Sequence, residues 1–175
     1  MGSGRQTMLD PSSIICELMQ WCSDIEYCVF NKSSAIKYCD KIICEFDQPP
    51  YEIIELSLMA ERTNDEIRSC IYSFCNSSPT IANRYLSLLK ILESVNNNDD
   101  FWIIRNATFS FLMNYREQIP DEIQRLIYTV DHYIDDGCLE NGYVTENQIL
   151  EAIFELKNRL LNSSLTSHYT GDGHK

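Results

Sequence analysis

The sequence predicts an all-α protein of about eight helices in consecutive hairpins, packed as either a compact bundle or a short HEAT-like solenoid. Helix start and stop signals recur along the chain, and the apolar residues between them follow helical spacing. A composition of 44% hydrophobic and 23% charged residues is typical of a globular protein. The only hairpin-like signal, Asn141-Gly142, is equally compatible with a loop between two helices.

Four helices are expected in the first half of the chain. Asp10-Pro11 is an N-cap followed by proline at the first helical position. Pro49-Pro50 interrupts the helical pattern, and Thr63 and Glu66 have the spacing of a capping box. The expected helices span residues 11–30, 33–46, 51–60 and 64–75.

Four more helices are expected in the second half. Ser78-Pro79 repeats the cap-and-proline signal, Asp121 and Glu122 follow a proline, and Thr145 begins a second capping box. Gly137 is a suitable residue to end the seventh helix. The sixth helix is the richest in aromatic residues, so we expect it to be the most buried. The expected helices span residues 79–95, 100–113, 121–136 and 146–161.

The chain reads as one helical domain over residues 10–162, with disordered ends at 1–9 and 163–175 that lack an apolar period. The net charge of −12 disfavours nucleic acid as a partner, because the phosphate backbone would be repelled. No apolar run is long enough to cross a membrane, and the polar N-terminus does not resemble a signal peptide. We therefore expect a cytoplasmic protein with no membrane partner.

Eight cysteines are present, and seven of them lie within apolar helical patterns. Free cysteine behaves as a small hydrophobic residue, so we expect buried, reduced thiols rather than disulfides. The closest pairs are five residues apart, which places them on different faces of a helix and argues against a zinc site. The cysteines are Cys16, Cys22, Cys28, Cys39, Cys44, Cys70, Cys75 and Cys138.

No established catalytic motif occurs in the sequence. His132 is the only histidine outside the presumed tail, and it shares a helix face with Asp136, as Asp131 does with Asp135. A proton relay or cation site there is conceivable, but the simpler interpretation is a solvated acidic face. We expect no enzyme activity, no cofactor and no metal site. A helical enzyme or metal protein centred on His132 is the third functional hypothesis.

The negative charge is concentrated between residues 117 and 155, where ten acidic residues accompany one base, Arg125. Asp135 and Asp136 are placed at the unfavourable, negative end of a helix dipole, which suggests another use for them. Tyrosines between the acids could anchor an interface, although a merely solubilising acidic face is the alternative. The predicted partner-binding residues are Asp121, Glu122, Tyr128, Asp131, Tyr133, Asp135, Asp136, Glu140 and Tyr143.

In its small size, cytosolic use of cysteine, hairpin-like helices such as residues 47–54, and acidic 117–155 region, the chain resembles bacterial immunity proteins of contact-dependent inhibition and related polymorphic toxin systems. The resemblance implies a non-catalytic inhibitor that binds a cognate toxin, often a nuclease and here expected to be basic, and blocks its active site or substrate entry. A helical adaptor or regulatory scaffold is the alternative. An exposed apolar groove, or self-association through the aromatic sixth helix, would distinguish such a protein from an inhibitor.

Overall fold

The computed structural model describes residues 10–95, 100–135 and 138–163. These residues form eight α-helices and short 3₁₀ segments, and they contain no strand, which confirms the all-α prediction. The contacts divide the chain into two compact units, residues 1–80 and 81–175. That residues 10–162 fold as a single domain stays a prediction.

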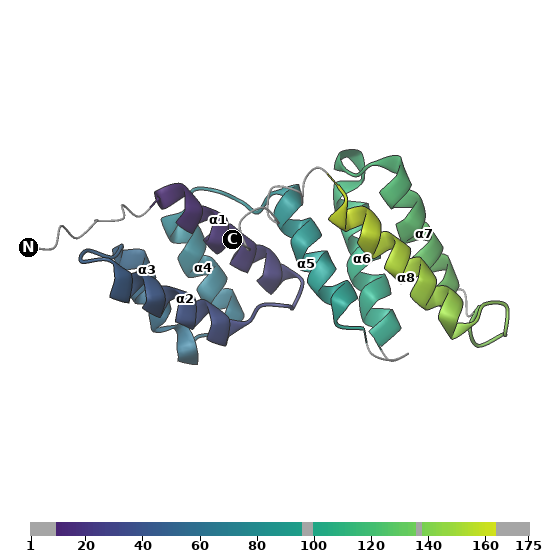
Figure 1. The fold of residues 1–175 in the computed structure, drawn as a ribbon, viewed down its shortest axis with the longest axis horizontal. Helices are drawn as coiled ribbons and strands as arrows, with labels where there is room; N and C mark the ends of the chain where they lie inside the picture. The colour runs from purple at the N-terminus through teal and green to yellow at the C-terminus, as the bar shows by residue number, and fades with distance from the viewer. Residues whose placement is uncertain (1–9, 96–99, 136–137, 164–175) are drawn as a thin grey trace, which may run out of the picture. The chain divides into compact units, whose positions relative to one another are not determined.

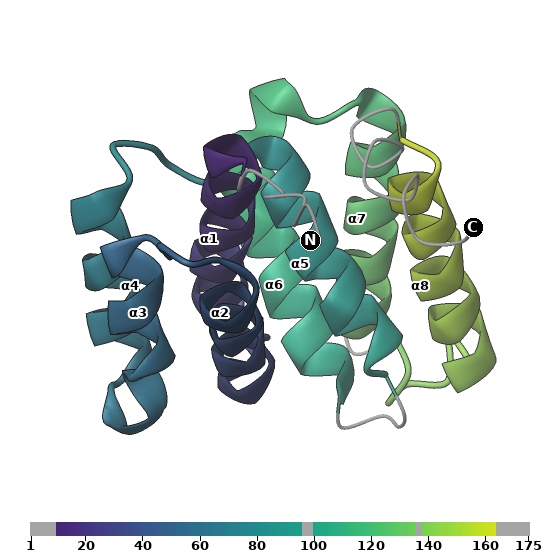
Figure 2. The same cartoon turned by 60° about the vertical axis from the view of Figure 1, so that its left-hand side comes forward.

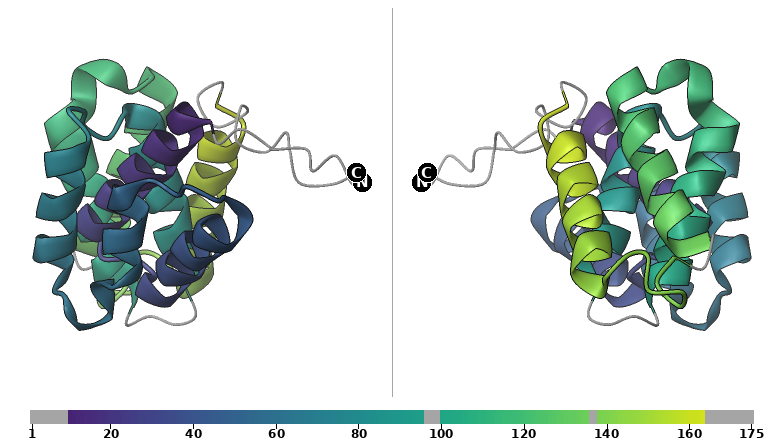
Figure 3. Two further views of the ribbon diagram at one scale, coloured as in Figure 1. Left: turned by 90° about the vertical axis from the view of Figure 1, so that its left-hand side faces the viewer. Right: turned by 90° about the vertical axis from the view of Figure 1, so that its right-hand side faces the viewer.

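The first unit holds four α-helices and one 3₁₀ turn. Helix α2 packs against α3 and the 3₁₀ turn, and α1 packs against α4 (Figure 3, left). Aliphatic residues from all four helices, together with the Trp21 ring and three thiols, form one buried cluster. The elements are α1 (Pro11–Glu26), α2 (Lys32–Glu45), α3 (Tyr51–Ser57), η1 (Met59–Glu61) and α4 (Asn64–Phe74).

The second unit is a four-helix bundle. Each helix packs against the next in the chain, and α8 returns to pack against α5, which closes the bundle (Figures 1 and 2). Short connections between antiparallel neighbours are the usual topology of such bundles. The elements are α5 (Ile81–Glu93), α6 (Phe101–Tyr115), η3 (Arg116–Gln118), α7 (Asp121–Asp135) and α8 (Glu146–Leu161).

Both predicted capping boxes are present. The backbone N–H of Thr63 donates to the Glu66 carboxylate at 2.7 Å, and the Glu66 N–H donates to the Thr63 hydroxyl at 3.2 Å. This backbone hydrogen bond lowers the pKa of Glu66. Thr145 and Gln148 make the same reciprocal pair at the start of α8. Each box satisfies backbone donors that a helix start would otherwise leave unpaired.

The first helix ends at Glu26, whereas the sequence predicted a helix to about Phe30. The chain reverses there in a Schellman motif: the Val29 N–H donates to the Asp24 carbonyl at 2.8 Å, and the Cys28 N–H donates to the Ile25 carbonyl at 3.2 Å. Cys28 adopts the left-handed conformation, with φ of 58°. Because glycine usually occupies this position, the sequence carried no stop signal that could be read.

Two further expectations in the second unit are wrong. Helix α5 begins at Ile81, two residues after Pro79, and the residue before it is Thr80, a preferred N-cap type. Helix α6 is not the most buried helix, because Trp102, Ile103 and Met113 are exposed. Its apolar residues run around the whole helix, while the bundle covers only one side.

The thiols differ in their exposure to solvent. All eight cysteines are free, and the prediction of buried thiols is confirmed for Cys22, Cys39, Cys75 and Cys138. It is wrong for the exposed side chains of Cys16, Cys28 and Cys44, whereas that of Cys70 is intermediate. Burial raises the pKa of the Cys22 and Cys39 thiols to about 12, so both are protonated at neutral pH.

The predicted disordered ends lie outside the described residues, apart from Ser163, and so does Gly137. None of the helices in the described ranges combines the length and the apolar run needed to cross a bilayer.

We predict that Cys28→Gly stabilises the protein by about 1 kcal/mol, because glycine removes the clash of a Cβ atom in the left-handed region. Equilibrium urea unfolding measures the change. Cys28→Ala is the matched control: it removes the thiol and keeps the Cβ atom, so it should leave stability nearly unchanged. A glycine variant no more stable than the alanine variant would contradict the prediction.

Tyr85 is fully buried against Phe111, with ring centroids 5.6 Å apart, and its hydroxyl has no hydrogen-bond partner among the described residues. Burial raises the pKa of Tyr85 to about 12. A buried hydroxyl without a partner retains the cost of its desolvation and gains nothing in return.

We therefore predict that Tyr85→Phe stabilises the protein by about 1 kcal/mol at pH 7. Above pH 10 the unfolded tyrosine loses its proton while the folded one keeps it to about pH 12, so wild-type stability should fall as the pH rises through this window. The stability of the phenylalanine variant should fall less over the same pH range. Urea unfolding from pH 7 to 11 tests both points, and a destabilised variant at pH 7 would show that the hydroxyl is bonded.

Candidate partner-binding surface

Helix α7 presents a polar side that the bundle leaves outside its core. Four aliphatic residues spaced three and four apart, Ile123, Ile127, Val130 and Ile134, are buried on the opposite side. Tyr128, Asp131 and Asp135 share another face by the same spacing. Ion pairs of Asp131 and Asp135 with a residue of α6 show that this face turns toward α6.

Arg105 of α6 lies between two carboxylates of α7. Its Nε donates to Asp131 Oδ1 at 2.6 Å, and its Nη2 lies 3.1 Å from Asp135 Oδ2. The side chains of Arg105 and Asp131 are only about one-fifth exposed, at 20% and 19%. Such short, partly buried, charge-assisted contacts are stronger than ordinary surface ion pairs. They link α6 to α7.

Aromatic rings of α6 enclose the same guanidinium group. The Arg105 Cζ atom lies 5.0 Å from the centroid of the Phe109 ring and 5.9 Å from that of Trp102. Both distances are within the range of cation–π attraction. Two rings and two carboxylates therefore surround the Arg105 guanidinium group, so the cation at this place on the surface belongs to the protein itself.

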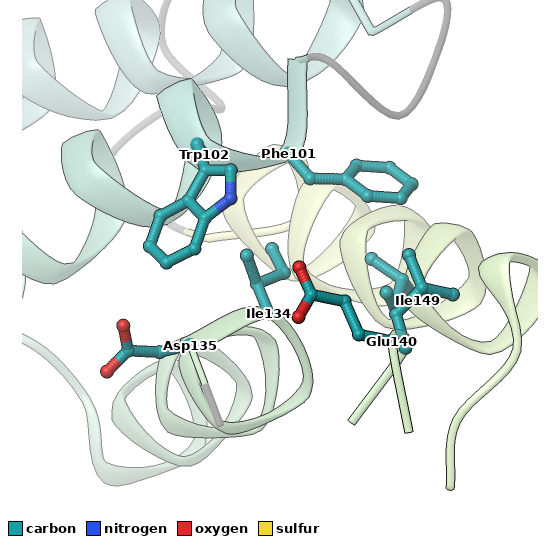
Figure 4. A pocket seen from close by; sticks show the side chains of 7 residues that line it. Phe101, Trp102, Ile134, Asp135, Glu140 and Ile149 are labelled. Carbon is teal, nitrogen blue, oxygen red and sulfur yellow. The ribbon is translucent and has the colours of Figure 1, made fainter. Parts of the chain in front are cut away.

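A small pocket adjoins this cluster (Figure 4). Its volume is about 130 Å³, close to that of cavities of roughly 150 Å³ that accept benzene, and below the range of about 300–1,000 Å³ typical of ligand sites. It therefore has room for one side chain of a partner. It is lined by Phe101, Trp102, Ile134, Asp135, Leu139, Glu140 and Ile149.

Glu140 is the carboxylate of this pocket that remains available. Asp135 is held by Arg105, and Figure 4 shows the two carboxyl groups on opposite sides of Ile134. Glu140 is exposed and has neither an ion pair nor a hydrogen bond within the described ranges. The pocket therefore combines apolar walls, an indole ring and one unpaired negative charge.

The loop that carries Glu140 is held by its own backbone. The N–H groups of Tyr143 and Val144 both donate to the Cys138 carbonyl, at 2.8 and 3.1 Å. Gly142 has a φ of 72°, so the Asn141-Gly142 signal marks a turn between helices and not a strand pair. Val144 is buried, whereas the Tyr143 ring next to it is 80% exposed.

Two of the other predicted site residues, Glu122 and Tyr133, lie on another side of α7. Glu122 pairs with Arg159 of α8 at 2.8 Å. Tyr133, eleven residues or about three turns further along, shares that side of α7, and its ring lies 6.1 Å from that of His132. Asp121 is exposed at the start of α7, seven residues before Tyr128, and so shares the face of Tyr128 and Asp135. Asp136 lies outside the described residues.

The charge count over residues 117–155 leaves out two bases that pack against this segment. Arg105 neutralises Asp131 and Asp135, and Arg159 neutralises Glu122. Both bases lie outside the 117–155 segment in which the charges were counted, and they reach it only through packing of α6 and α8 against α7. The unfavourable place of Asp135 at the end of its helix is explained by Arg105 and does not by itself require a partner.

Sequence reasoning also missed residues that the fold brings to the surface. Trp102 lies within a helix expected to be buried, yet it is 50% exposed at the pocket. On α8, Leu150 and Phe154 are exposed and were not assigned to the buried stripe. Their spacing of four residues, on a different side from Ile149 and Ile153, was the available signal.

His132 is exposed on α7 and does not line the pocket at Trp102. Within the described ranges, no group of three His, Cys, Asp or Glu side chains is arranged to hold a metal ion. No family model, curated protein or solved structure matches the chain.

We predict that Asp131→Asn destabilises the protein by about 1–2 kcal/mol, since it weakens a partly buried charge-assisted hydrogen bond. Thermal or urea unfolding measures the loss. Glu155→Gln, which removes an exposed carboxylate from the middle of α8, is the matched control and should change stability by less than about 0.5 kcal/mol. If the two substitutions changed stability equally, the contact between Arg105 and Asp131 would contribute no more to stability than an exposed carboxylate does.

Proposed function

We propose that this chain is a non-catalytic immunity or inhibitor protein of the cytoplasm, which binds and neutralises a cognate, basic protein toxin of the nuclease type. The proposal combines the resemblance in size, helical organisation and charge with the surface built on α6, α7 and the loop before α8. It assigns the protein a binding role and no reaction of its own.

The observation that carries the proposal is the pocket at Glu140. A lysine or arginine side chain could lay its methylene groups against Leu139 and the exposed indole ring of Trp102 and bring its charge to Glu140. Exposed Tyr128 and Tyr143 lie on the adjoining α7 and loop, and tyrosine is a common anchor of protein interfaces.

The charge of the whole chain supports the same partner. A net charge of −12 attracts a basic protein and accelerates its association. The basic groups with which a nuclease holds its phosphate backbone are complementary to carboxylates placed at a binding surface. An acidic protein bound to these basic groups would exclude the nucleic acid from the nuclease without any chemical step.

We predict that Glu140→Lys abolishes capture of the partner. The tagged protein is incubated with lysate of its native cells at low and at high salt, and bound proteins are identified by mass spectrometry. The wild type should retain one basic partner at low salt and less of it at high salt. Glu117→Lys reverses an exposed acid in η3, away from the pocket, and should retain the partner.

Two results would contradict the proposal. One is a partner captured equally by the wild type and by Glu140→Lys. The other is a wild-type protein that captures no basic protein at either salt concentration although it is folded by circular dichroism.

A helical adaptor or scaffold is the second candidate, because the first unit carries an apolar pocket of about 220 Å³ between α1, α3 and α4. Ile14, Leu18 and Ile53 line it and are buried, whereas Ile15 is 42% exposed. An adaptor that used this pocket would bind partners independently of salt. Loss of capture in Ile15→Ser but not in Glu140→Lys would favour it.

A further inference from the structure

The outer side of α8 carries an apolar stripe that the bundle does not cover. Its inner side buries Ile149, Ile153, Leu156 and Leu160. Leu150, Phe154 and Leu161 are spaced by four and seven residues, so they share a different side of the same helix. They are 38%, 63% and 38% exposed. Figure 3, right, shows α8 in yellow on the outside of the bundle, beside α7.

Ion pairs fix the orientation of this stripe. Lys157 reaches Glu93 of α5 at 3.7 Å, and Arg159 reaches Glu122 of α7 at 2.8 Å. Lys157 lies seven residues after Leu150, so it shares the side of the stripe and reaches along its edge to α5, whereas Arg159 is turned toward α7. The stripe therefore holds three apolar side chains and one lysine, and that lysine is already paired with Glu93.

Acidic residues border the stripe on one flank. Glu151 and Glu155 are exposed, follow Leu150 and Phe154 directly, and are one turn apart. Neither has an ion pair or hydrogen bond within the described part of the chain. The outer side of α8 thus offers three apolar side chains next to a paired lysine, with unpaired negative charge on the other flank.

This charge pattern distinguishes between two occupants. A second copy of the chain would bring its own Glu151 and Glu155 to the interface, while its Lys157 and Arg159 remain engaged with Glu93 and Glu122. Like charges would then face each other without compensation. A basic amphipathic helix would bury the apolar row and pair with both carboxylates.

We propose that the outer side of α8 is a docking surface for a basic amphipathic helix of a partner protein. Leu150, Phe154 and Leu161 receive the apolar side of that helix, and Glu151 and Glu155 pair with its lysine or arginine residues. This surface is separate from the pocket at Glu140, so it gives the protein a second point of contact with a partner.

Fluorescence anisotropy with the full chain tests the proposal. The probe is a labelled synthetic helical peptide with leucines along one side and lysines beside them; a second peptide has glutamates in place of the lysines. The lysine peptide should bind, and the glutamate peptide should bind at least about ten-fold more weakly. Phe154→Ser should weaken binding of the lysine peptide by about ten-fold or more, as expected for loss of an aromatic anchor.

Two controls keep the result specific. Leu58→Ser removes an apolar side chain that is 72% exposed in the first unit, and it should leave peptide binding unchanged. Glu140→Gln should also leave it unchanged, which separates this surface from the pocket of the proposed function. If Phe154→Ser fails to fold, the double substitution Glu151→Lys and Glu155→Lys provides the same test through charge.

Three results would overturn the proposal: no binding of the lysine peptide, equal binding of both peptides, or binding that neither α8 variant weakens. Sedimentation velocity supplies a fourth. A dimer that dissociates in Phe154→Ser would assign this side of α8 to a second copy of the chain.

Discussion

The contact on which the second unit's surface depends is the guanidinium group of Arg105 between Asp131 and Asp135. It links α6 to α7 and brings the positive charge of Arg105 close to the Trp102 and Phe109 rings. It also holds Asp135, which forms one wall of the pocket. It also uses two of the carboxylates that the sequence offered as partner contacts. What remains available to a partner is Glu140 and the rings beside it.

Much of the fold follows from local signals. The two capping boxes, Pro11 at the start of α1 and the prolines before α3 all mark real helix starts. Local signals failed where the backbone conformation is unusual for the residue type. Cys28 ends α1 in a conformation that favours glycine, and no propensity rule identifies a cysteine as a stop.

The candidate site was less predictable because it depends on packing between helices. Counting charges from residue 117 to 155 could not include Arg105, which lies 26 residues before Asp131 and pairs with it across two helices. The exposure of Trp102 likewise depends on which side of α6 the bundle covers. The periodicity of a helix identifies its apolar side, but a helix with apolar residues on every side, such as α6, gives no such direction.

The central claim, that a basic partner binds the second unit at the pocket, is tested most directly by hydrogen–deuterium exchange of the captured complex. Our account predicts slower exchange in the loop 138–145 and at the start of α6, with the first unit unchanged. Protection confined to α1, α3 and α4 would contradict it and place the partner on the apolar pocket of the first unit.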